Sequence, residues 1–476
     1  MIYSFIGFLL FFAVIGLSSS FFSRGTKTDY YLANGEVPAW LVGLSAVATN
    51  NSGYMFIGVI GYTYIAGFSS IWLMIGWICG DFIASCYVHR RLRDATHASG
   101  EVSYAGVLSN WYGQNHRKVQ RLIGLISLLF LLTYASAQMI AGSKALHVLL
   151  DWPLWGGAAV GAILICLYCF TGGIRAPIWT DAAQSMVMIG AMGTLFATAL
   201  IDQGGIANTL DKMYAIEGFT DWFPRELPVP GWGGLLIFTV SWIFAGLSVI
   251  GQPHVMVRFM ALEGSDKMRQ ARTWYYLWFI LFYCMATAVG LLSRVYIADV
   301  GGFDAELALP TMAMELLNPV FVGLVLAGIF AATMSTADSL LLSCSAAITH
   351  DVLPYKLEKT RLLKFTTVLM TFGALLLALF NNQSVFSLVI FSWSGLASAF
   401  GPLLLVLSFG GKPSQLTSIT AIFVGFVTAI LWRHFELHNM VYEGLPGILS
   451  GLLVFYLAQN FTRIADWKTT NAESAR

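Results

Sequence analysis

The stretch LSAVATNNSGYMFIG, residues 44–58, lies inside a long apolar segment, yet its centre is polar. Five weak helix formers follow one another there: Thr49, Asn50, Asn51, Ser52 and Gly53. Their side chains compete for the hydrogen bonds of the helix backbone. In a membrane, a broken helix is tolerated only where the freed backbone groups line a site. The stretch therefore predicts a broken membrane helix with a site at the break.

The composition places this stretch in a membrane protein. Of 476 residues, 57% are hydrophobic and only 11% are charged, and the mean hydropathy is +0.71. Such values do not suit a soluble surface and predict a multi-pass membrane protein in contact with the lipid bilayer. Since a spanning helix needs about 20 apolar residues, the chain offers about thirteen candidates. They lie at residues 2–22, 38–65, 68–89, 121–149, 153–172, 177–201, 231–253, 273–298, 311–349, 362–381, 384–408, 414–432 and 443–461.

A second segment also looks interrupted. FAGLSVIGQPH, residues 244–254, contains Gly246, Ser248, Gly251 and Pro253 within an apolar run. Two interrupted segments about five helices apart, one in each half, indicate an inverted-repeat secondary transporter with a site at the midplane.

The basic residues predict the orientation of the chain. Lys and Arg gather in cytoplasmic loops of membrane proteins. With the N-terminus outside and the C-terminus in the cytoplasm, the cytoplasmic side receives Arg24/Lys27, Arg90/Arg91/Arg93, Arg117/Lys118/Arg121, Arg258/Lys267/Arg269/Arg272, Lys356/Lys359/Arg361/Lys364 and Arg463/Lys468.

Four motifs carry a resemblance to a known family. GGIRAPIWTDAAQ (172–184) and MSTADSLLLSCSAAITHD (334–351) resemble the two signatures of the sodium/solute symporter family. GQPHVMVRFMA (251–261) and FSWSGLASAFGP (391–402) resemble its amino-acid branch, typified by sodium/proline symporters. The resemblance implies an all-α fold of about thirteen helices, with a LeuT-like core of five-plus-five inverted repeats. On this fold the chain divides into an extra helix and loop (1–37), a first repeat (38–201), an external loop (202–230), a second repeat (231–408), and two further helices with a short tail (409–476). The resemblance also implies a plasma-membrane location, such as the inner membrane of a bacterium.

The resemblance implies a first sodium site between the break and the eighth helix of the core. By motif, its ligands are the carbonyls of Ala48, Asn51 and Ala332 and the hydroxyls of Ser335 and Thr336. Oxygen ligands of this kind suit a hard cation such as Na⁺. The alternative is that the two hydroxyls bond only to the preceding turn of their own helix.

Some members of the family hold a second sodium ion at positions that match Asp181, Asp338 and Ser339. Asp338 departs from the proline-symporter pattern, and it could ligate a second cation, carry a proton, or be a structural hydrogen-bonded acid. Buried ionisable groups in membranes are functional candidates. Asp81 is another acid inside a span, for which pairing with Arg90 or another basic residue is the structural alternative.

The substrate site at the midplane is expected to be lined mainly by apolar side chains, with a few amides and hydroxyls. The predicted residues are Asn50, Ser52, Met55, Met74, Trp77, Tyr134, Gln138, Trp242, Ala245, Val249, Phe391 and Trp393. Such a lining suits a small amphipathic solute better than a sugar. Proline symporters carry an acid at the position of Asn50 and aromatic residues at those of Ala245 and Val249, so the solute itself is left open.

These observations predict a sodium-coupled symporter for a small organic solute, with an amino acid of the proline type as the leading candidate. The resemblance implies Na⁺ as the coupling ion, and no organic cofactor or nucleic-acid partner is expected. An alternative is a transporter-like sensor domain that acts with a separate signalling partner, whose existence the sequence leaves unknown. An enzyme is not expected, because the spans contain no HExxH or GxSxG motif and no Cys/His nucleophile constellation.

Overall fold

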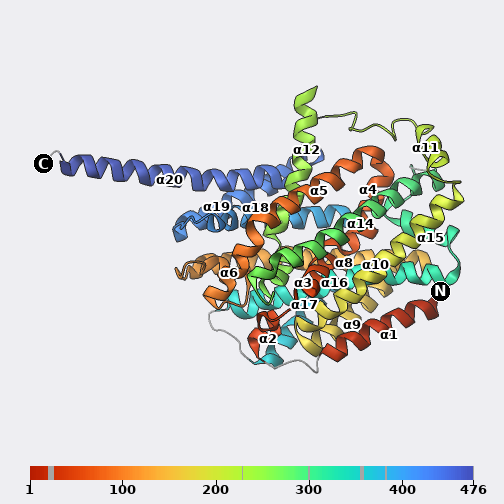
Figure 1. Ribbon diagram of the computed structural model, residues 1–476, viewed down its shortest axis with the longest axis horizontal. Coiled ribbons are helices and arrows are strands. Elements are labelled where there is room, and N and C mark those ends of the chain that lie inside the picture. The colour runs from red at the N-terminus through yellow and green to blue at the C-terminus, as the bar shows by residue number, and fades with distance from the viewer. Residues whose placement is uncertain (20–25, 228, 299–300, 354–358, 381–382, 475–476) are drawn as a thin grey trace.

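The protein is described by a computed structural model (Figure 1) that covers residues 1–19, 26–227, 229–298, 301–353, 359–380 and 383–474. Only the backbone is described for residues 19, 167–172, 360 and 461–474. The described chain is helical and contains no strand beyond an isolated bridge between Val37 and Leu262.

The first half of the chain contains these helices: α1 (Ile2–Ser19), α2 (Lys27–Leu32), α3 (Ala39–Phe56), α4 (Gly58–Ala66), α5 (Ile71–Ala84), α6 (Arg90–Ser99), α7 (Tyr104–Ser109), α8 (Arg117–Leu150), α9 (Leu154–Gly172), α10 (Arg175–Asp202) and α11 (Ile206–Tyr214). The second half contains α12 (Trp232–Leu247), α13 (Pro253–Met260), α14 (Met268–Tyr296), α15 (Ala308–Leu316), α16 (Pro319–Ala346), α17 (Thr360–Phe380), α18 (Val385–Ser408), α19 (Gln415–His434) and α20 (Gly444–Ser474).

Nine helices of the described chain are long and apolar enough to cross a membrane. Helices also occupy the other predicted segments, either as shorter apolar helices or as broken ones. The all-helical membrane fold is therefore confirmed. The count of thirteen spans and the division into repeats stay predictions.

Both predicted breaks are present. In α3, Ser52 has φ 39° and ψ 179°, which interrupts the helix within the polar cluster of residues 49–53. In the second segment, α12 passes into a 3₁₀ turn, η5 (Ser248–Gly251), and Gln252 is extended before Pro253 begins α13. Pro253 suits the first turn of a helix because it has no backbone N–H to leave unpaired.

One predicted boundary was wrong. The segment 311–349 is divided, because α15 ends at Leu316 and α16 begins at Pro319. The side chain of Asn318 accepts hydrogen bonds from the backbone N–H groups of Val320 (3.1 Å) and Phe321 (3.3 Å). Asn at the N-cap and Pro at the first helical position form a strong helix start.

The broken α3 lies at the centre of the bundle, where it packs against α10, α14 and α16. Helix α16 also contacts α8 and α10, whereas α5 packs along α12. The α5–α12 contact is close because a Cβ atom at Gly80 or Gly246 would collide with the backbone of the facing helix. Small residues permit this approach of membrane helices. Helix α20 extends away from the bundle at its C-terminal end (Figure 1).

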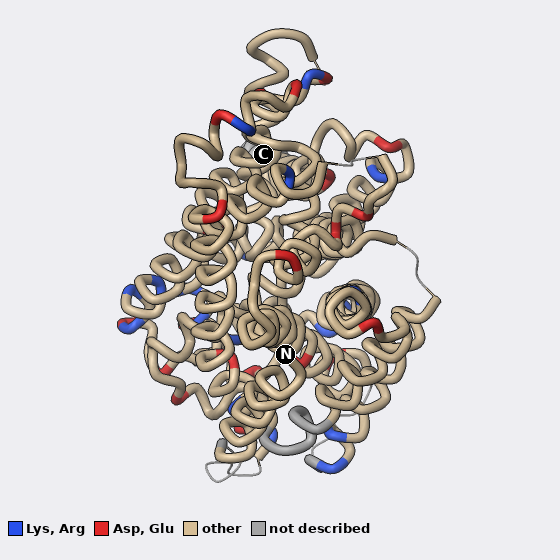
Figure 2. The backbone as a smooth tube through the Cα atoms, turned by 90° about the vertical axis from the view of Figure 1, so that its right-hand side faces the viewer, with Lys and Arg blue, Asp and Glu red and all other residues tan. Residues whose placement is uncertain are grey.

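Figure 2 shows Lys and Arg mainly around the rim of the bundle. Of the predicted cytoplasmic residues, Arg24 and Lys356 lie outside the described residues, and the side chains of Arg463 and Lys468 are not described. Arg258, predicted on the cytoplasmic side together with Lys267, Arg269 and Arg272, is only 1% exposed, so its side chain is not part of an exposed basic cluster. The orientation of the termini stays a prediction.

Candidate functional site

The break in α3 is held by two side chains of α8. The hydroxyl of Tyr134 donates to Ser52 Oγ (3.2 Å), and the side-chain oxygen of Gln138 accepts from the backbone N–H of Gly53 (2.8 Å). Ser52 Oγ in turn accepts from the N–H of Tyr54 (3.1 Å). The freed backbone groups are thus satisfied by residues predicted for the substrate site. The amide nitrogen of Gln138 has no partner in the described chain.

The second break is tied to α18 through Trp393. The indole N–H of Trp393 donates to the carbonyl of Ala245 (2.8 Å), and its own carbonyl accepts from Gln252 Nε2 (2.9 Å). The ring is fully buried, with its centroid 5.5 Å from that of Trp77. Trp393 and Ala245 were predicted to bind substrate, whereas here their polar groups stabilise the broken helix.

The residues predicted for the first sodium site come together where α16 meets the break of α3. The hydroxyl of Thr336 donates to the carbonyl of Thr49 (2.9 Å). The Ser335 hydroxyl lies near the Asp181 carboxylate but forms no hydrogen bond of normal geometry within the described chain. Asn51 Oδ1 is also without a partner there. Ala48 and Ala332, whose carbonyls complete the predicted ligand set, are fully buried.

Next to this site lie two acids and a hydroxyl, those of Asp181, Asp338 and Ser339, which we call the acidic cluster. Asp181 Oδ2 accepts from Ser45 Oγ (2.5 Å) and from Thr49 Oγ1 (3.4 Å), whereas its Oδ1 has no partner among the residues with described side chains. Ser339 Oγ lies 2.6 Å from the carbonyl of Ser335 and 3.0 Å from Asp338 Oδ1, so its single proton is shared between two acceptors. The predicted second-cation residues are therefore neighbours.

The sequence prediction missed the cation already present in this cluster. The guanidinium of Arg258, on α13, lies 3.4 Å from Asp181 Oδ2 and also donates to Ser339 Oγ. It contacts Ser45 Oγ (3.3 Å) and the carbonyl of His254 (3.1 Å) as well. A sequence signal existed, because Arg258 stands alone in the apolar run VMVRFMA, well before Lys267, Arg269 and Arg272.

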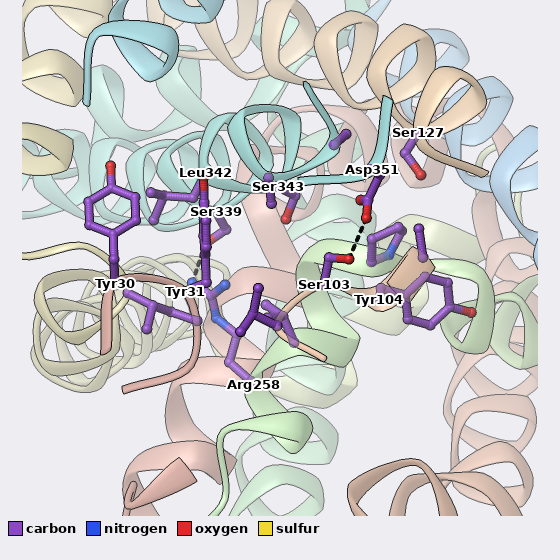
Figure 3. Close-up of a pocket in the computed structure, with 17 residues that line it drawn as sticks. Tyr30, Tyr31, Ser103, Tyr104, Ser127, Arg258, Ser339, Leu342, Ser343 and Asp351 are labelled. Atoms are coloured by element: carbon purple, nitrogen blue, oxygen red, sulfur yellow. Dashed lines mark hydrogen bonds between the residues drawn. The ribbon is translucent and has the colours of Figure 1, made fainter. Parts of the chain in front are cut away.

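A small cavity of about 40 Å³ adjoins this cluster (Figure 3). Arg258 and Ser339 line it together with Tyr31, and Asp351 and Ser103 lie at its other end, joined by a hydrogen bond of 2.6 Å. Gln120 also donates to Asp351 (2.8 Å). The cavity thus leads from the acidic cluster to the C-terminal end of α16 and η8 (Ala347–Val352).

A larger cavity of about 510 Å³ lies on the side of the 202–230 loop and α19. Its lining includes Tyr62, Trp242 and Phe386, and the rings of Tyr62 and Phe386 are stacked with centroids 4.8 Å apart. Phe386 also stacks on Tyr54 (5.5 Å), which contacts Trp77 (5.6 Å). A layer of aromatic rings therefore separates this cavity from the two breaks.

The other predicted substrate residues are scattered. Val249 and Met55 are buried at the breaks, and Met74 accepts a hydrogen bond from Thr287 at its sulfur (3.5 Å). Phe391 faces Phe130, with ring centroids 5.2 Å apart. Asn50 donates to Asp81 (3.1 Å), which places its amide on the side of α5 and α14. Among the described side chains Asp81 forms no ion pair with Arg90 or another basic residue, because its carboxylate accepts hydrogen bonds from Asn50, Tyr275 and Tyr276.

A membrane bundle in which two broken helices meet a buried group of hydroxyl, carbonyl and carboxylate oxygens has the architecture of a secondary transporter. Solved structures share the fold. The alignment with a Na⁺-coupled sialic acid symporter in a substrate-bound outward-open state covers 95% of each chain, with a TM-score of 0.79 and 18% identity. The nucleobase-cation-symport-1 family transporter MHP1, closed with bromovinylhydantoin bound, covers 92% of this chain and 94% of its own with a TM-score of 0.58 and 14% identity.

The chain belongs to the sodium:solute symporter family, whose model matches residues 30–425. It is similar to the high-affinity proline transporter PutP of Bacillus subtilis, with 27% identity over 93% of this chain and 94% of that protein. It is also similar to the sodium/proline symporter of Escherichia coli, with 29% identity over 91% and 89%. These relatives are transporters and not enzymes, which agrees with the sequence prediction.

Proposed function

We propose that this protein is a sodium-coupled symporter that carries a small amphipathic solute, an amino acid of the proline type, into the cell by alternating access. Family membership and the sodium/proline symporters among its relatives support this function. The N-terminus would lie outside, the aromatic-lined cavity would open to the exterior, and the cavity beside Arg258 would open to the cytoplasm.

The observation that carries the proposal is the group of unsatisfied oxygens at the break of α3. Ser335 Oγ, Asn51 Oδ1 and Asp181 Oδ1 are buried without a hydrogen-bond partner in the described chain. Such atoms are costly in a membrane interior unless something binds them. Because all three are oxygens, a hard cation such as Na⁺ is the ligand that would satisfy them.

The proposed solute would be held by unpaired donors near the breaks. Gln138 Nε2 and Trp242 Nε1 are both buried and lack acceptors among the described atoms. Both are suited to donate to a solute carboxylate. A cationic amino or imino group could instead contact backbone carbonyls or the face of an aromatic ring such as Trp242.

A second cation beside Asp338 is also part of the proposal. When Asp181 and Asp338 are ionised, the single positive charge of Arg258 leaves the cluster with a net charge of −1. Cations bound at the first sodium site and beside Asp338 would offset this negative charge, and an uncompensated charge is unfavourable in the membrane interior.

Uptake into proteoliposomes tests the proposed function. A panel of labelled amino acids is offered with an inward sodium gradient, with equal sodium on both sides, and with a potassium gradient. We expect accumulation of at least one small amino acid only with the sodium gradient. Equal uptake under all three conditions would refute sodium coupling, and uptake of none of the amino acids would refute the solute class.

A further inference from the structure

A buried polar cluster outside the sodium and acidic sites surrounds Asp81 on α5. Its carboxylate is fully buried. Oδ1 accepts from the hydroxyl of Tyr276 (2.5 Å), and Oδ2 accepts from the hydroxyl of Tyr275 (2.9 Å) and from Asn50 Nδ2 (3.1 Å). The cluster thus joins α5, α14 and the polar centre of α3.

Asp81 makes no ion pair with any basic side chain that the structure describes. Arg272 lies one turn before Tyr276 on α14, but its guanidinium donates to the carbonyl of Ser85 (3.0 Å) and to Cys86 Sγ (3.8 Å) instead of Asp81. His89 stacks on Phe259 with ring centroids 3.9 Å apart. A carboxylate buried in a membrane without a counter-charge is costly in its ionised form.

The other elements packed against α5 do not supply a counter-charge. Helix α12 and the two 3₁₀ turns η3 (Gly67–Ser70) and η5 contain no titratable side chain. The other buried titratable side chains of α3 and α14 are the phenols of Tyr54 and Tyr283, and neither bonds to Asp81. With no counter-charge beside it, Asp81 loses its negative charge only when its carboxylate binds a proton.

The amide of Asn50 can form a hydrogen bond with Asp81 whether the carboxyl group is ionised or protonated. In the present arrangement its amide nitrogen faces Asp81 and also contacts the Tyr275 hydroxyl, while its Oδ1 has no partner within the described chain. This arrangement provides three donors for an ionised carboxylate. A half-turn of the amide would present Oδ1 instead, as the acceptor that a protonated Asp81 needs.

We propose that Asp81 is a proton-binding site and that the side chain of Asn50 reverses its hydrogen bonding when the proton arrives or leaves. Asn50 lies two residues before Ser52, where the helix is interrupted, and next to Asn51, which has an unpaired oxygen. Protonation of Asp81 therefore changes the hydrogen bonding of the segment that the solute and sodium sites share. Among the side chains of this cluster, only Asp81 and the two phenols titrate.

Infrared difference spectra of the purified protein in lipid nanodiscs, recorded between mildly acidic and alkaline pH, test the site directly. We expect a pH-dependent carbonyl band of a protonated carboxylic acid that is lost in Asp81→Asn and displaced in Asp81→Glu. Asp94→Asn, which removes an exposed acid on the neighbouring α6, is the matched control and should leave that band unchanged. The measurement involves no transport, so its outcome is independent of the proposed symport.

Two further variants test the geometry. Tyr276→Phe removes a donor to the ionised form, so the midpoint of the band's titration should rise by about one pH unit or more. Asn50→Leu removes the acceptor for the acid O–H and should move the band to higher frequency. An acid band at Asp81 that does not respond to pH, or the absence of any band that Asp81→Asn removes, would overturn the proposal.

Discussion

The hydroxyl of Thr336 offers the sharpest test of the first sodium site. It is fully buried and donates to the carbonyl of Thr49 (2.9 Å), so it joins α16 to the broken helix α3. Thr336→Val keeps the shape of the side chain and replaces the hydroxyl with a methyl group. Thr336→Ser keeps the oxygen and removes a methyl group.

The expected magnitude follows from what the hydroxyl does. Removing one partner of a buried hydrogen bond costs about 1–3 kcal/mol. If the oxygen also ligates Na⁺, its removal should weaken the binding free energy of Na⁺ by a similar amount. A difference of about 1–3 kcal/mol corresponds to about a 5- to 150-fold change in an equilibrium constant. We therefore expect the sodium concentration for half-maximal uptake to rise about 5- to 150-fold in Thr336→Val and much less in Thr336→Ser.

The assay is initial-rate uptake into proteoliposomes at varied external sodium, normalised to the amount of reconstituted protein. Thr371→Val is the matched control, because Thr371 is equally buried and donates to the carbonyl of Thr367 (2.9 Å) on α17, away from the breaks. It should leave the sodium dependence unchanged. The reasoning is refuted if Thr336→Val and Thr371→Val show the same half-saturating sodium as the wild type.

Three more predictions concern the buried charges and the second break. Asp338→Asn should lower the Hill coefficient for sodium in uptake while leaving the site at Thr336 intact; an unchanged coefficient would show that Asp338 holds no second cation. Arg258→Gln leaves Asp181 and Asp338 without their counter-charge, which typically costs about 3–5 kcal/mol of stability. Added sodium should therefore raise the unfolding temperature of this variant more than that of the wild type. An equal rise in both proteins would contradict the role of Arg258 as the counter-charge. Trp393→Phe removes the hydrogen bond to the Ala245 carbonyl and should lower the free energy of unfolding by about 1–3 kcal/mol without altering solute preference. A changed preference in the uptake panel would instead show that Trp393 contacts the solute.

The two breaks could be predicted from the sequence because their causes are local. Five weak helix formers in succession weaken α3 at Ser52, and Gly251 with Pro253 interrupts the second segment, whatever lies around them. The start of α16 also had a local signal in Asn318 and Pro319, which hydropathy alone does not register.

The partners of the buried polar groups could not be predicted in the same way. Arg258 is 77 residues from Asp181, and Asp81 is 194 residues from Tyr275, so only the packed bundle determines that they meet. The same is true of Trp393, whose indole satisfies a carbonyl 148 residues away. Residue type indicated that these side chains were unusual in a membrane, but their roles depend on which helix faces which.

The charges around the two breaks suggest why transport would be coupled to cations. The described side chains around the two breaks include three buried carboxylates, those of Asp81, Asp181 and Asp338, and one buried guanidinium, that of Arg258, which contacts Asp181. If all are ionised the centre carries a net charge of −2, and rearranging helices around an uncompensated buried charge is unfavourable. A proton on Asp81 and a cation beside Asp338 would each remove one negative charge. A centre whose buried negative charge is offset in this way should change conformation more readily than an unloaded one, which is the condition that coupling of solute movement to a cation gradient requires.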